Sequence, residues 1–503
     1  MKIEQIFRNA GMASAQVVLS GGMLFALYYF LLREIGPSQL GVWSIVLATS
    51  SAVRLSELGL SGGVIRFVAK YVARQEAVKA ANVVQTATVS TAIFLAVILF
   101  LLYPVVGSVL RFFIPVESHT QAMSLLPFAL MSLWLLTIGG IFTSGLDGVL
   151  RTDVRSYIMT GGVAIHLALV LLLVPAYGLL GLGYSQVIQS TFVLIFSWWS
   201  LRRELPSLPL FPFRWNRQIF IEILRYGLNV QAASVAQMLF DPTTKMLLSK
   251  FGGLDSVAFF EMANRMVTQV RGLVVSANQV MVPIFSRLHE ETPNQISSIY
   301  RKSYDLLIFV ALPIFSAIAA MIPIVSELWI GSYQPLFVNF SYVLAVGWFL
   351  NTLNAPSYFS NMGTGDLNWN TIAHITIGVL NAVLGVVFGF LFGGRGVVLG
   401  FVIALALGSS LVVFNYHARN GIQYHELIPK KHWLLCLASL VVPTLTWQVY
   451  SNLRDQLGVS WLFSISLLLV TGTLLSVVWI NPMRRQLMSQ VLSGYGKSVE
   501  VRN

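Results

Sequence analysis

Long apolar runs, separated by short polar stretches, constrain the fold of this chain more than any other feature of its 503 residues. Many of these runs reach the roughly 20 residues that an α-helix needs to cross the hydrocarbon core of a bilayer. Only 10% of the residues are charged, whereas a soluble domain carries about 25%. The sequence therefore predicts an all-α polytopic membrane protein, and it excludes a soluble enzyme, a nucleic-acid-binding protein and a soluble signalling module.

The apolar runs predict about fourteen spans, arranged as two sets of six and a last pair. The predicted spans are 9–32, 40–63, 81–105, 121–146, 156–176, 180–201, 223–249, 255–282, 303–326, 335–358, 370–392, 394–416, 432–450 and 460–480. They divide the chain into an N-terminal six-helix lobe (1–201), a cytoplasmic connector and elbow (202–222), a C-terminal six-helix lobe (223–416), an extra helix pair (432–480) and a cytoplasmic tail (481–503).

Basic residues set the predicted orientation of these spans. Because the number of spans is even, both termini lie on one side of the membrane, and alternate loops belong to that side. Those loops hold 23 of the 32 basic residues, while the opposite loops hold five. By the positive-inside rule both termini are cytoplasmic, and most of the net charge of +12 reflects topology rather than ligand binding.

The two sets of six spans also resemble each other, which indicates an internal repeat. The matched positions, at offsets of 214 to 217 residues, include Gly36 with Gly253, Arg54 with Arg271, Trp134 with Trp348, and Gly178 with Gly393. Because each half has six spans, both halves enter the membrane from the same side, so the repeats are parallel. Transporters built from such repeats bind their substrate between the two halves.

Several short segments recur in a known family in this order and on this layout of spans. They are Ile35–Trp43, Glu57–Leu60 with Arg66, Tyr177–Gly181, Phe240–Pro242 with Lys245, and Gly252–Gly253 leading to Phe259. Because of these segments, the chain resembles the polysaccharide-transporter branch of the multidrug/oligosaccharidyl-lipid/polysaccharide flippase superfamily. Glu57 stands where the family often has Asp, and the loop Asn361–Asn368 lacks a basic residue that is often found there.

This resemblance implies two six-helix lobes, as in multidrug and toxin extruders, around a central cavity that works by alternating access. The implied cargo is an undecaprenyl-pyrophosphate-linked oligosaccharide, such as the O-antigen repeat unit of lipopolysaccharide or an exopolysaccharide unit, which crosses the bacterial inner membrane. The implied partners are the lipid-linked substrate, the bilayer, and possible polysaccharide polymerase and export machinery, with no nucleic acid.

Charged side chains inside predicted spans are candidates for the cargo site, because each costs at least about 2.5 kcal/mol unless it is paired or faces water. They are Arg54 and Glu57 in the second span, Asp241 and Lys245 in the seventh, and Glu261, Arg265 and Arg271 in the eighth. Several can pair along a helix at i,i+3 or i,i+4, which leaves a purely structural role as an alternative. The resemblance places the second and eighth spans against the cavity.

Arg271 differs from the other charged residues, because no acidic residue lies three or four positions away from it. Its repeat counterpart Arg54 lies at the same predicted depth. A guanidinium group can engage two phosphate oxygens at once and stays charged at physiological pH. We therefore expect Arg54 and Arg271 to hold the pyrophosphate of the cargo. Further candidate substrate-binding residues are Glu57, Asp241, Lys245 and Arg265.

Two tryptophans, Trp134 and Trp348, lie near the middle of predicted spans. Their rings are candidates for stacking on sugar rings of the cargo, and packing inside the helix bundle is the alternative. The lone Cys436 provides no cysteine-ligated zinc site, and no nucleotide-binding or catalytic motif falls in a loop. We therefore expect neither a cofactor nor a metal ion.

Two other functions compete with the flippase. The first is a multidrug or cation extruder of the same fold, which would need a net acidic cavity; the in-span charges are instead four basic and three acidic. The second is a membrane enzyme such as a glycan polymerase or ligase, which needs catalytic residues on a sizeable external loop. The longest predicted external loop, Gly107 to Gln121, offers only Arg111, Glu117 and His119, so we expect that the chain is not an enzyme.

Overall fold

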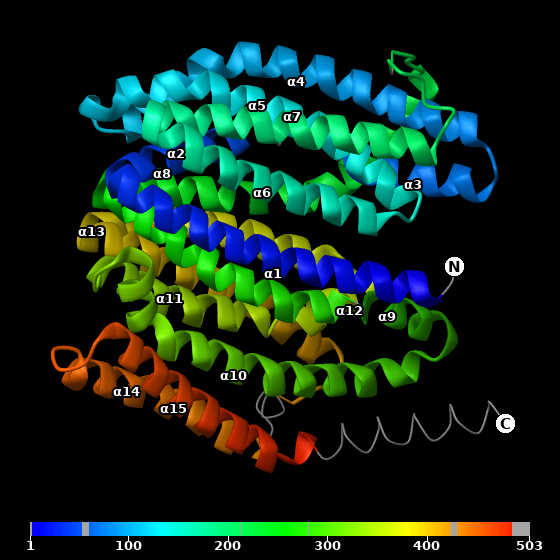
Figure 1. The fold of residues 1–503 in the computed structure, drawn as a ribbon. Coiled ribbons are helices and arrows are strands. Elements are labelled where there is room, and N and C mark those ends of the chain that lie inside the picture. Colours follow the sequence, from blue (N-terminus) through cyan, green and yellow to red (C-terminus); the bar gives the residue numbers. More distant parts are fainter. Residues whose placement is uncertain (1–2, 53–59, 212, 280, 424–429, 485–503) are drawn as a thin grey trace. The chain divides into compact units, whose positions relative to one another are not determined.

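The computed structural model describes residues 3–52, 60–211, 213–279, 281–423 and 430–484, and every regular element in these ranges is helical (Figure 1). The helices are α1 (Ile3–Glu34), α2 (Gly36–Ala52), α3 (Leu60–Ala73), α4 (Ala77–Phe113), α5 (Val116–Gly148), α6 (Thr152–Tyr177), α7 (Leu179–Glu204), α8 (Arg217–Gln279), α9 (Met281–Glu291), η2 (Pro293–Gln295), α10 (Ile296–Ile330), α11 (Pro335–Thr352), α12 (Ala355–Thr364), α13 (Asn368–Arg419), η4 (Lys430–His432), α14 (Trp433–Leu453) and α15 (Val459–Ile480).

These helices confirm the predicted all-α membrane fold. In the part of the chain that the structure describes, nine helical stretches are long and apolar enough to cross a membrane. The 52-residue α13 contains two predicted spans, and non-helical φ and ψ at Gly393 separate them. Gly253 divides the 63-residue α8 in the same way. The total of fourteen spans stays a prediction.

The backbone has matching geometry at positions that the internal repeat pairs. Gly36 and Gly253 have φ of 76° and 78°, and Gly178 and Gly393 have φ of 55° and 63°. Glycine adopts positive φ readily, whereas other residues do so at a cost. Each of these glycines therefore ends one helical segment and starts the next, and the matched turns support the repeat.

Two ion pairs follow the same repeat with their charges exchanged. Arg151, just before α6, pairs with Glu204 at the end of α7. Asp366, just before α13, pairs with Arg419 at its end. Adding 215 to 151 and 204 gives 366 and 419. An ion pair thus joins equivalent helix ends in both halves. The arginine is at the first of the two positions in one half and at the second in the other.

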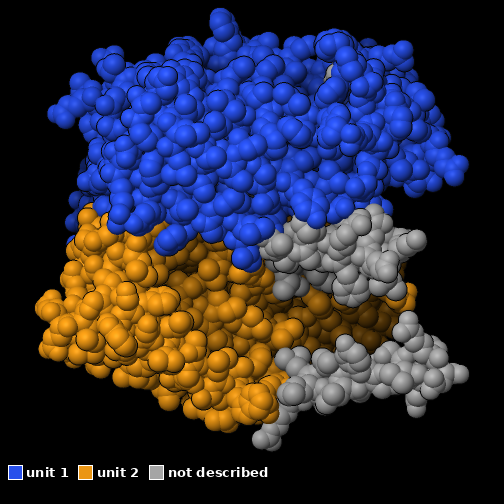
Figure 2. Space-filling model, viewed as in Figure 1, with its two compact units in different colours: residues 1–262, 377–401 blue, residues 263–376, 402–503 orange. Residues whose placement is uncertain are grey.

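The chain forms two compact units (Figure 2). Unit 1 comprises residues 1–262 and 377–401, and unit 2 comprises residues 263–376 and 402–503. The long helices α8 and α13 each contribute segments to both units. The predicted six-helix lobes, connector, extra pair and tail stay predictions.

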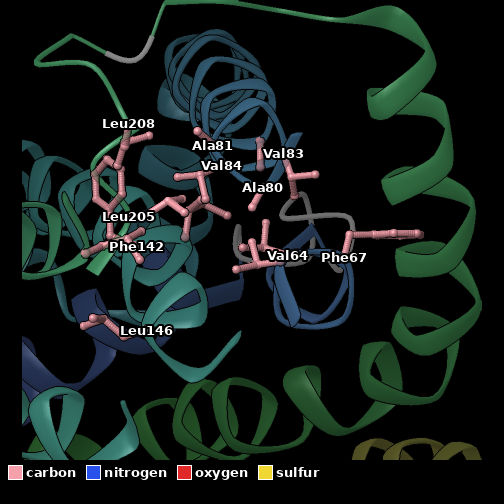
Figure 3. Close-up of a cluster of buried hydrophobic side chains, with 14 of the residues drawn as sticks. Val64, Phe67, Ala80, Ala81, Val83, Val84, Phe142, Leu146, Leu205 and Leu208 are labelled. Atoms are coloured by element: carbon pink, nitrogen blue, oxygen red, sulfur yellow. The ribbon is translucent and has the colours of Figure 1, made fainter. Parts of the chain in front are cut away.

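The core of unit 1 includes a cluster of buried apolar side chains where α3, α4 and α5 meet (Figure 3). Val64 of α3 and Val84 of α4 have no exposed surface, and Phe142 of α5 is 3% exposed. Leu205 and Leu208, which follow α7, also lie in this cluster. The chain beyond α7 is therefore fixed to the core.

The core of unit 2 includes the contact of α10 with α14 and α15. Ala320, Val442 and Val470 form a buried apolar cluster there. Toward the other end of α10, the Tyr300 hydroxyl lies within hydrogen-bond distance of Ser357 Oγ and His417 Nε2, at 2.9 and 2.8 Å. Because α10, α12 and α13 all contribute to this buried network, it fixes their packing.

Candidate functional site

The structure describes six of the eight predicted site residues, three in each of its two units. Arg54 and Glu57 lie outside the described residues. Asp241, Lys245 and Trp134 lie in unit 1, whereas Arg265, Arg271 and Trp348 lie in unit 2.

A buried charge cluster in unit 1 is built around Lys245. Its Nζ lies 2.7 Å from Asp241 Oδ2, one helical turn earlier, and 2.6 Å from Glu261 Oε2. Asp241 and Lys245 precede the break at Gly253, and Glu261 follows it. The Tyr28 hydroxyl of α1 donates a 3.0 Å hydrogen bond to Glu261 Oε1. The fold thus brings together four polar groups from three helical segments.

Burial differs between the two carboxylates of this cluster. The side chains of Lys245 and Glu261 are 6% and 4% exposed, whereas that of Asp241 is 42% exposed. An ammonium group inside a protein needs a counter-ion, and a buried carboxylate likewise needs compensation. Lys245 and Glu261 satisfy each other, so this pair explains why both charges can lie inside predicted spans. Direct binding of cargo by Asp241 and Lys245 stays a prediction.

A different environment surrounds Arg271 in unit 2. Its guanidinium carbon lies 4.8 Å from the centre of the Trp348 ring. Within the described residues, Arg271 has no carboxylate partner, and its Nε atom is buried without a hydrogen bond. The Trp348 Nε1 atom donates a 2.8 Å hydrogen bond to Asn264 Oδ1, and Asn264 lies seven residues, or about two helical turns, before Arg271.

This arrangement is suited to an anion. Stacking on the Trp348 ring orients the guanidinium plane of Arg271 and leaves its edge N–H groups available. Those N–H groups form a fork that matches two oxygens of a phosphate. Because no described carboxylate neutralises Arg271, an incoming anion would supply the missing charge.

The structure also shows contacts around Arg271 that the sequence alone does not predict. Arg271 and Trp348 were separate candidates, and the fold brings them into contact. Asn264 was not a candidate, although its spacing from Arg271 puts both residues on one face of the helix. Arg265, by contrast, is exposed on the same helical segment.

Trp134 lines a groove of about 810 Å³ between α4 and α5 in unit 1. Its Nε1 atom donates a 2.9 Å hydrogen bond to the carbonyl oxygen of Ala92, so the polar group of the ring is already satisfied. Pro104 of α4 and Pro127 of α5 lie inside their helices. The other lining residues are Ala96, Leu99, Phe100, Leu101, Tyr103, Leu130 and Met131. The lining suits a hydrocarbon group, and a role of Trp134 in sugar stacking stays a prediction.

Comparison with protein families gives a match for this chain. The model of a family described as "Polysaccharide biosynthesis protein" matches residues 6–289, which is more than half of the chain. No curated protein matches.

Solved membrane transporters have a similar fold. The lipid II flippase MurJ, in an inward closed conformation, is 13% identical with a TM-score of 0.73, over 95% of this chain and 99% of that chain. An inward-facing multidrug resistance MATE family transporter of the MOP superfamily is 17% identical with a TM-score of 0.72, over 81% and 94%. A MOP superfamily transporter from Pyrococcus furiosus has a TM-score of 0.61 at 17% identity, over 82% and 95%.

Proposed function

Because the chain belongs to the polysaccharide biosynthesis protein family and has the fold of MATE and MurJ transporters, we propose that it flips a lipid-linked saccharide across the bacterial inner membrane. The family and fold are those of a transporter rather than an enzyme. The proposed cargo is an undecaprenyl-pyrophosphate-linked oligosaccharide, the repeat unit of an O-antigen or exopolysaccharide. The proposed mechanism is alternating access, with the saccharide and pyrophosphate passing through the protein.

The observation that carries this proposal is the environment of Arg271. A half-buried cation that stacks on Trp348 and has no described carboxylate partner favours an anionic cargo over a cationic one. A pyrophosphate is the anionic group that every polyprenyl-pyrophosphate-linked saccharide shares, whatever its sugars. Arg271 would therefore recognise the common part of the cargo, and its repeat counterpart Arg54 would share this role.

The alternative, a multidrug or cation extruder, is favoured by a separate observation. The cluster in unit 1 carries two carboxylates for one ammonium group, and Asp241 is half-exposed. A cationic drug would use Asp241, whereas a pyrophosphate would use Arg271. The two functions thus depend on different residues.

Glycan export by variants tests the proposal. In a strain that lacks the native gene, Arg271→Ala should abolish surface glycan at a matched protein level, because losing a desolvated charge contact to a phosphate costs about 2 to 5 kcal/mol. Arg54→Ala should have the same effect. The control is Arg33→Ala, which removes an exposed arginine outside the predicted spans and should export normally.

Binding measured by native mass spectrometry separates the two functions. Undecaprenyl pyrophosphate should bind the wild type and should be lost from Arg271→Ala, whereas undecaprenol should bind neither specifically. Full glycan export by both Arg54→Ala and Arg271→Ala would contradict the proposed site. Efflux of a cationic dye that depends on Asp241 but not on Arg271 would favour the extruder.

A further inference from the structure

The segment between α7 and α8, of which the structure describes residues 205–211 and 213–216, is buried at one side and exposed at the other. Leu205 and Leu208 are 3% and 0% exposed and lie in the core cluster of unit 1 (Figure 3). Further along, the segment lies against α4 (Figure 1). The Arg214 amide donates a 3.3 Å hydrogen bond to Gln85 Oε1, and Trp215 Nε1 donates a 2.9 Å hydrogen bond to Ser90 Oγ. The conformation of the segment is therefore fixed by unit 1.

Four large apolar side chains of this segment face outward. Leu210 and Trp215 are 49% and 50% exposed, and Phe211 and Phe213 are 65% and 76% exposed. The rings of Phe211 and Phe213 are stacked with an interplanar angle of 6° and a centroid distance of 5.8 Å. Such a group of exposed aromatic side chains is costly in water and marks an interaction surface.

Three arginines lie close to these apolar side chains in the sequence. Arg203, Arg214 and Arg217 are exposed, and none of them forms an ion pair with a carboxylate among the described residues. The neighbouring acids are already engaged, since Glu204 pairs with Arg151 and Glu222 lies 3.6 Å from Lys70 Nζ. The surface therefore combines apolar rings with uncompensated positive charge.

The depth of the segment points to the membrane. Its partners Gln85 and Ser90 lie four and nine residues inside the predicted span 81–105, which is about 6 to 14 Å along the helix. Amphipathic elements that lie in the membrane surface bury their apolar side about 5 to 10 Å into the boundary between headgroups and acyl chains. The next exposed residues of α4, Ile93 and Phe94, are also apolar, so the surface continues into the lipid-facing side of that helix.

We propose that residues 205–211 and 213–217, with Arg203, form a binding surface for anionic phospholipids. Phe211 and Phe213 insert among the acyl chains at the boundary, and Arg203, Arg214 and Arg217 contact the lipid phosphates. In the predicted orientation this surface lies in the cytoplasmic leaflet. The inference is independent of the cargo, because it depends only on the exposed side of this segment. A water-soluble protein partner is disfavoured, since Gln85 and Ser90, which hydrogen-bond the segment, lie inside a predicted span.

Site-specific fluorescence in nanodiscs tests the insertion. In a Cys436→Ala background, Phe213→Cys carries an environment-sensitive dye, and Gln295→Cys, an exposed residue of a predicted cytoplasmic loop, is the matched control. In nanodiscs of phosphatidylcholine and phosphatidylglycerol, the dye at position 213 should emit at shorter wavelength and be quenched by spin-labelled lipid. The dye at position 295 should be quenched by iodide from the water. Iodide quenching at position 213 that equals the control would overturn the proposal and favour a protein partner.

The charge requirement needs a second measurement. Each arginine near an anionic surface is expected to change lipid affinity about fivefold. The triple variant Arg203→Gln/Arg214→Gln/Arg217→Gln should therefore lose most of the phosphatidylglycerol that native mass spectrometry finds on the wild type. Arg287→Gln, an exposed arginine paired with Glu291, is the control and should retain it. Equal retention of phosphatidylglycerol and phosphatidylcholine by the wild type would overturn the anionic specificity.

Discussion

At the scale of single residues, Lys245 and Arg271 show that two cations inside predicted spans can have different surroundings. Lys245 contacts two carboxylates, whereas Arg271 contacts an aromatic ring. A carboxylate cancels the charge of a cation, while a ring only orients and partly stabilises it. The charge of Lys245 is thus compensated inside the protein, whereas no described carboxylate compensates that of Arg271.

Removing the ammonium group of Lys245 should destabilise unit 1. Lys245→Met leaves Glu261 buried without its counter-ion, which costs about 3 to 5 kcal/mol. The double variant Lys245→Met/Glu261→Gln should recover most of this loss, because no buried charge then lacks a partner. Asp241→Asn should cost less than either single change of the buried pair, since Asp241 is 42% exposed. Reversible unfolding in mixed micelles measures all four proteins, and equal stability of Lys245→Met and wild type would contradict the role of the pair.

Trp348 should control how strongly Arg271 binds a phosphate. Trp348→Ala removes the ring beneath the guanidinium group, a contact of about 0.5 to 2 kcal/mol, and affinity for undecaprenyl pyrophosphate should fall by about 2- to 30-fold. Trp348→Phe keeps the ring face and loses the hydrogen bond to Asn264, so most of the affinity should remain. Titration of the purified proteins with undecaprenyl pyrophosphate, followed by native mass spectrometry, measures the affinities of the wild type and the two variants. An Ala variant that binds as well as the Phe variant would exclude the ring from the site.

At the scale of helices, both halves of the repeat contain a tight helical hairpin with glycines at matching positions. Gly178 separates α6 from α7, and Gly393 separates the two segments of α13. Soon after each turn a glycine faces a backbone carbonyl group: a Cβ atom at Gly181 would lie 2.4 Å from the oxygen of Leu173, and one at Gly396 would lie 1.9 Å from that of Phe388. Both hairpins therefore use glycine for the turn and for the close approach of the helices.

Alanine at these contact glycines should separate the helices and destabilise the protein. Gly181→Ala and Gly396→Ala each force a Cβ atom against backbone, which costs at least about 1 to 3 kcal/mol. Gly472→Ala in α15 is the control, because no atom lies within 4 Å of its Cβ position and alanine favours a helix by about 1 kcal/mol. In detergent, the midpoint of thermal unfolding of Gly472→Ala should be equal to or above that of the wild type. The midpoints of Gly181→Ala and Gly396→Ala should be below that of the wild type. A Gly396→Ala midpoint equal to that of the control would contradict the close contact.

At the scale of the whole molecule, the predicted orientation in the membrane determines which loops face the cytoplasm. The excess of basic residues in alternate loops predicts that both termini are cytoplasmic. That orientation decides the leaflet in which the proposed lipid-binding surface lies. The orientation is predicted from charge alone.

Single cysteines test this orientation. In a Cys436→Ala background, an impermeant thiol reagent added to intact cells should label Glu117→Cys, because that residue lies in a predicted external loop. Arg484→Cys, in the predicted cytoplasmic tail, should be labelled only after the membrane is opened. Labelling of Arg484→Cys in intact cells would reverse the assignment.

The sequence by itself determined the fold class, the family and the repeat. These properties depend on local features: the length of apolar runs, the place of glycines such as Gly253 and Gly393, and short segments such as Ile35–Trp43. A run of apolar residues about as long as the bilayer is thick has few alternatives to a spanning helix, because every backbone polar group must be satisfied internally. Helix breaks could therefore be predicted from the same pattern.

Only the tertiary structure decided which side chains meet. Sequence spacing allowed Lys245 to pair with Asp241, but it could not reveal Glu261 beyond the break at Gly253 or Tyr28 on α1. Likewise, Arg271 reaches Trp348 of α11, 77 positions along the chain. Contacts of this kind depend on how helices that are distant in the sequence pack against each other. Many apolar side chains determine that packing together, and the apolar pattern of one helix does not show which helix packs against it.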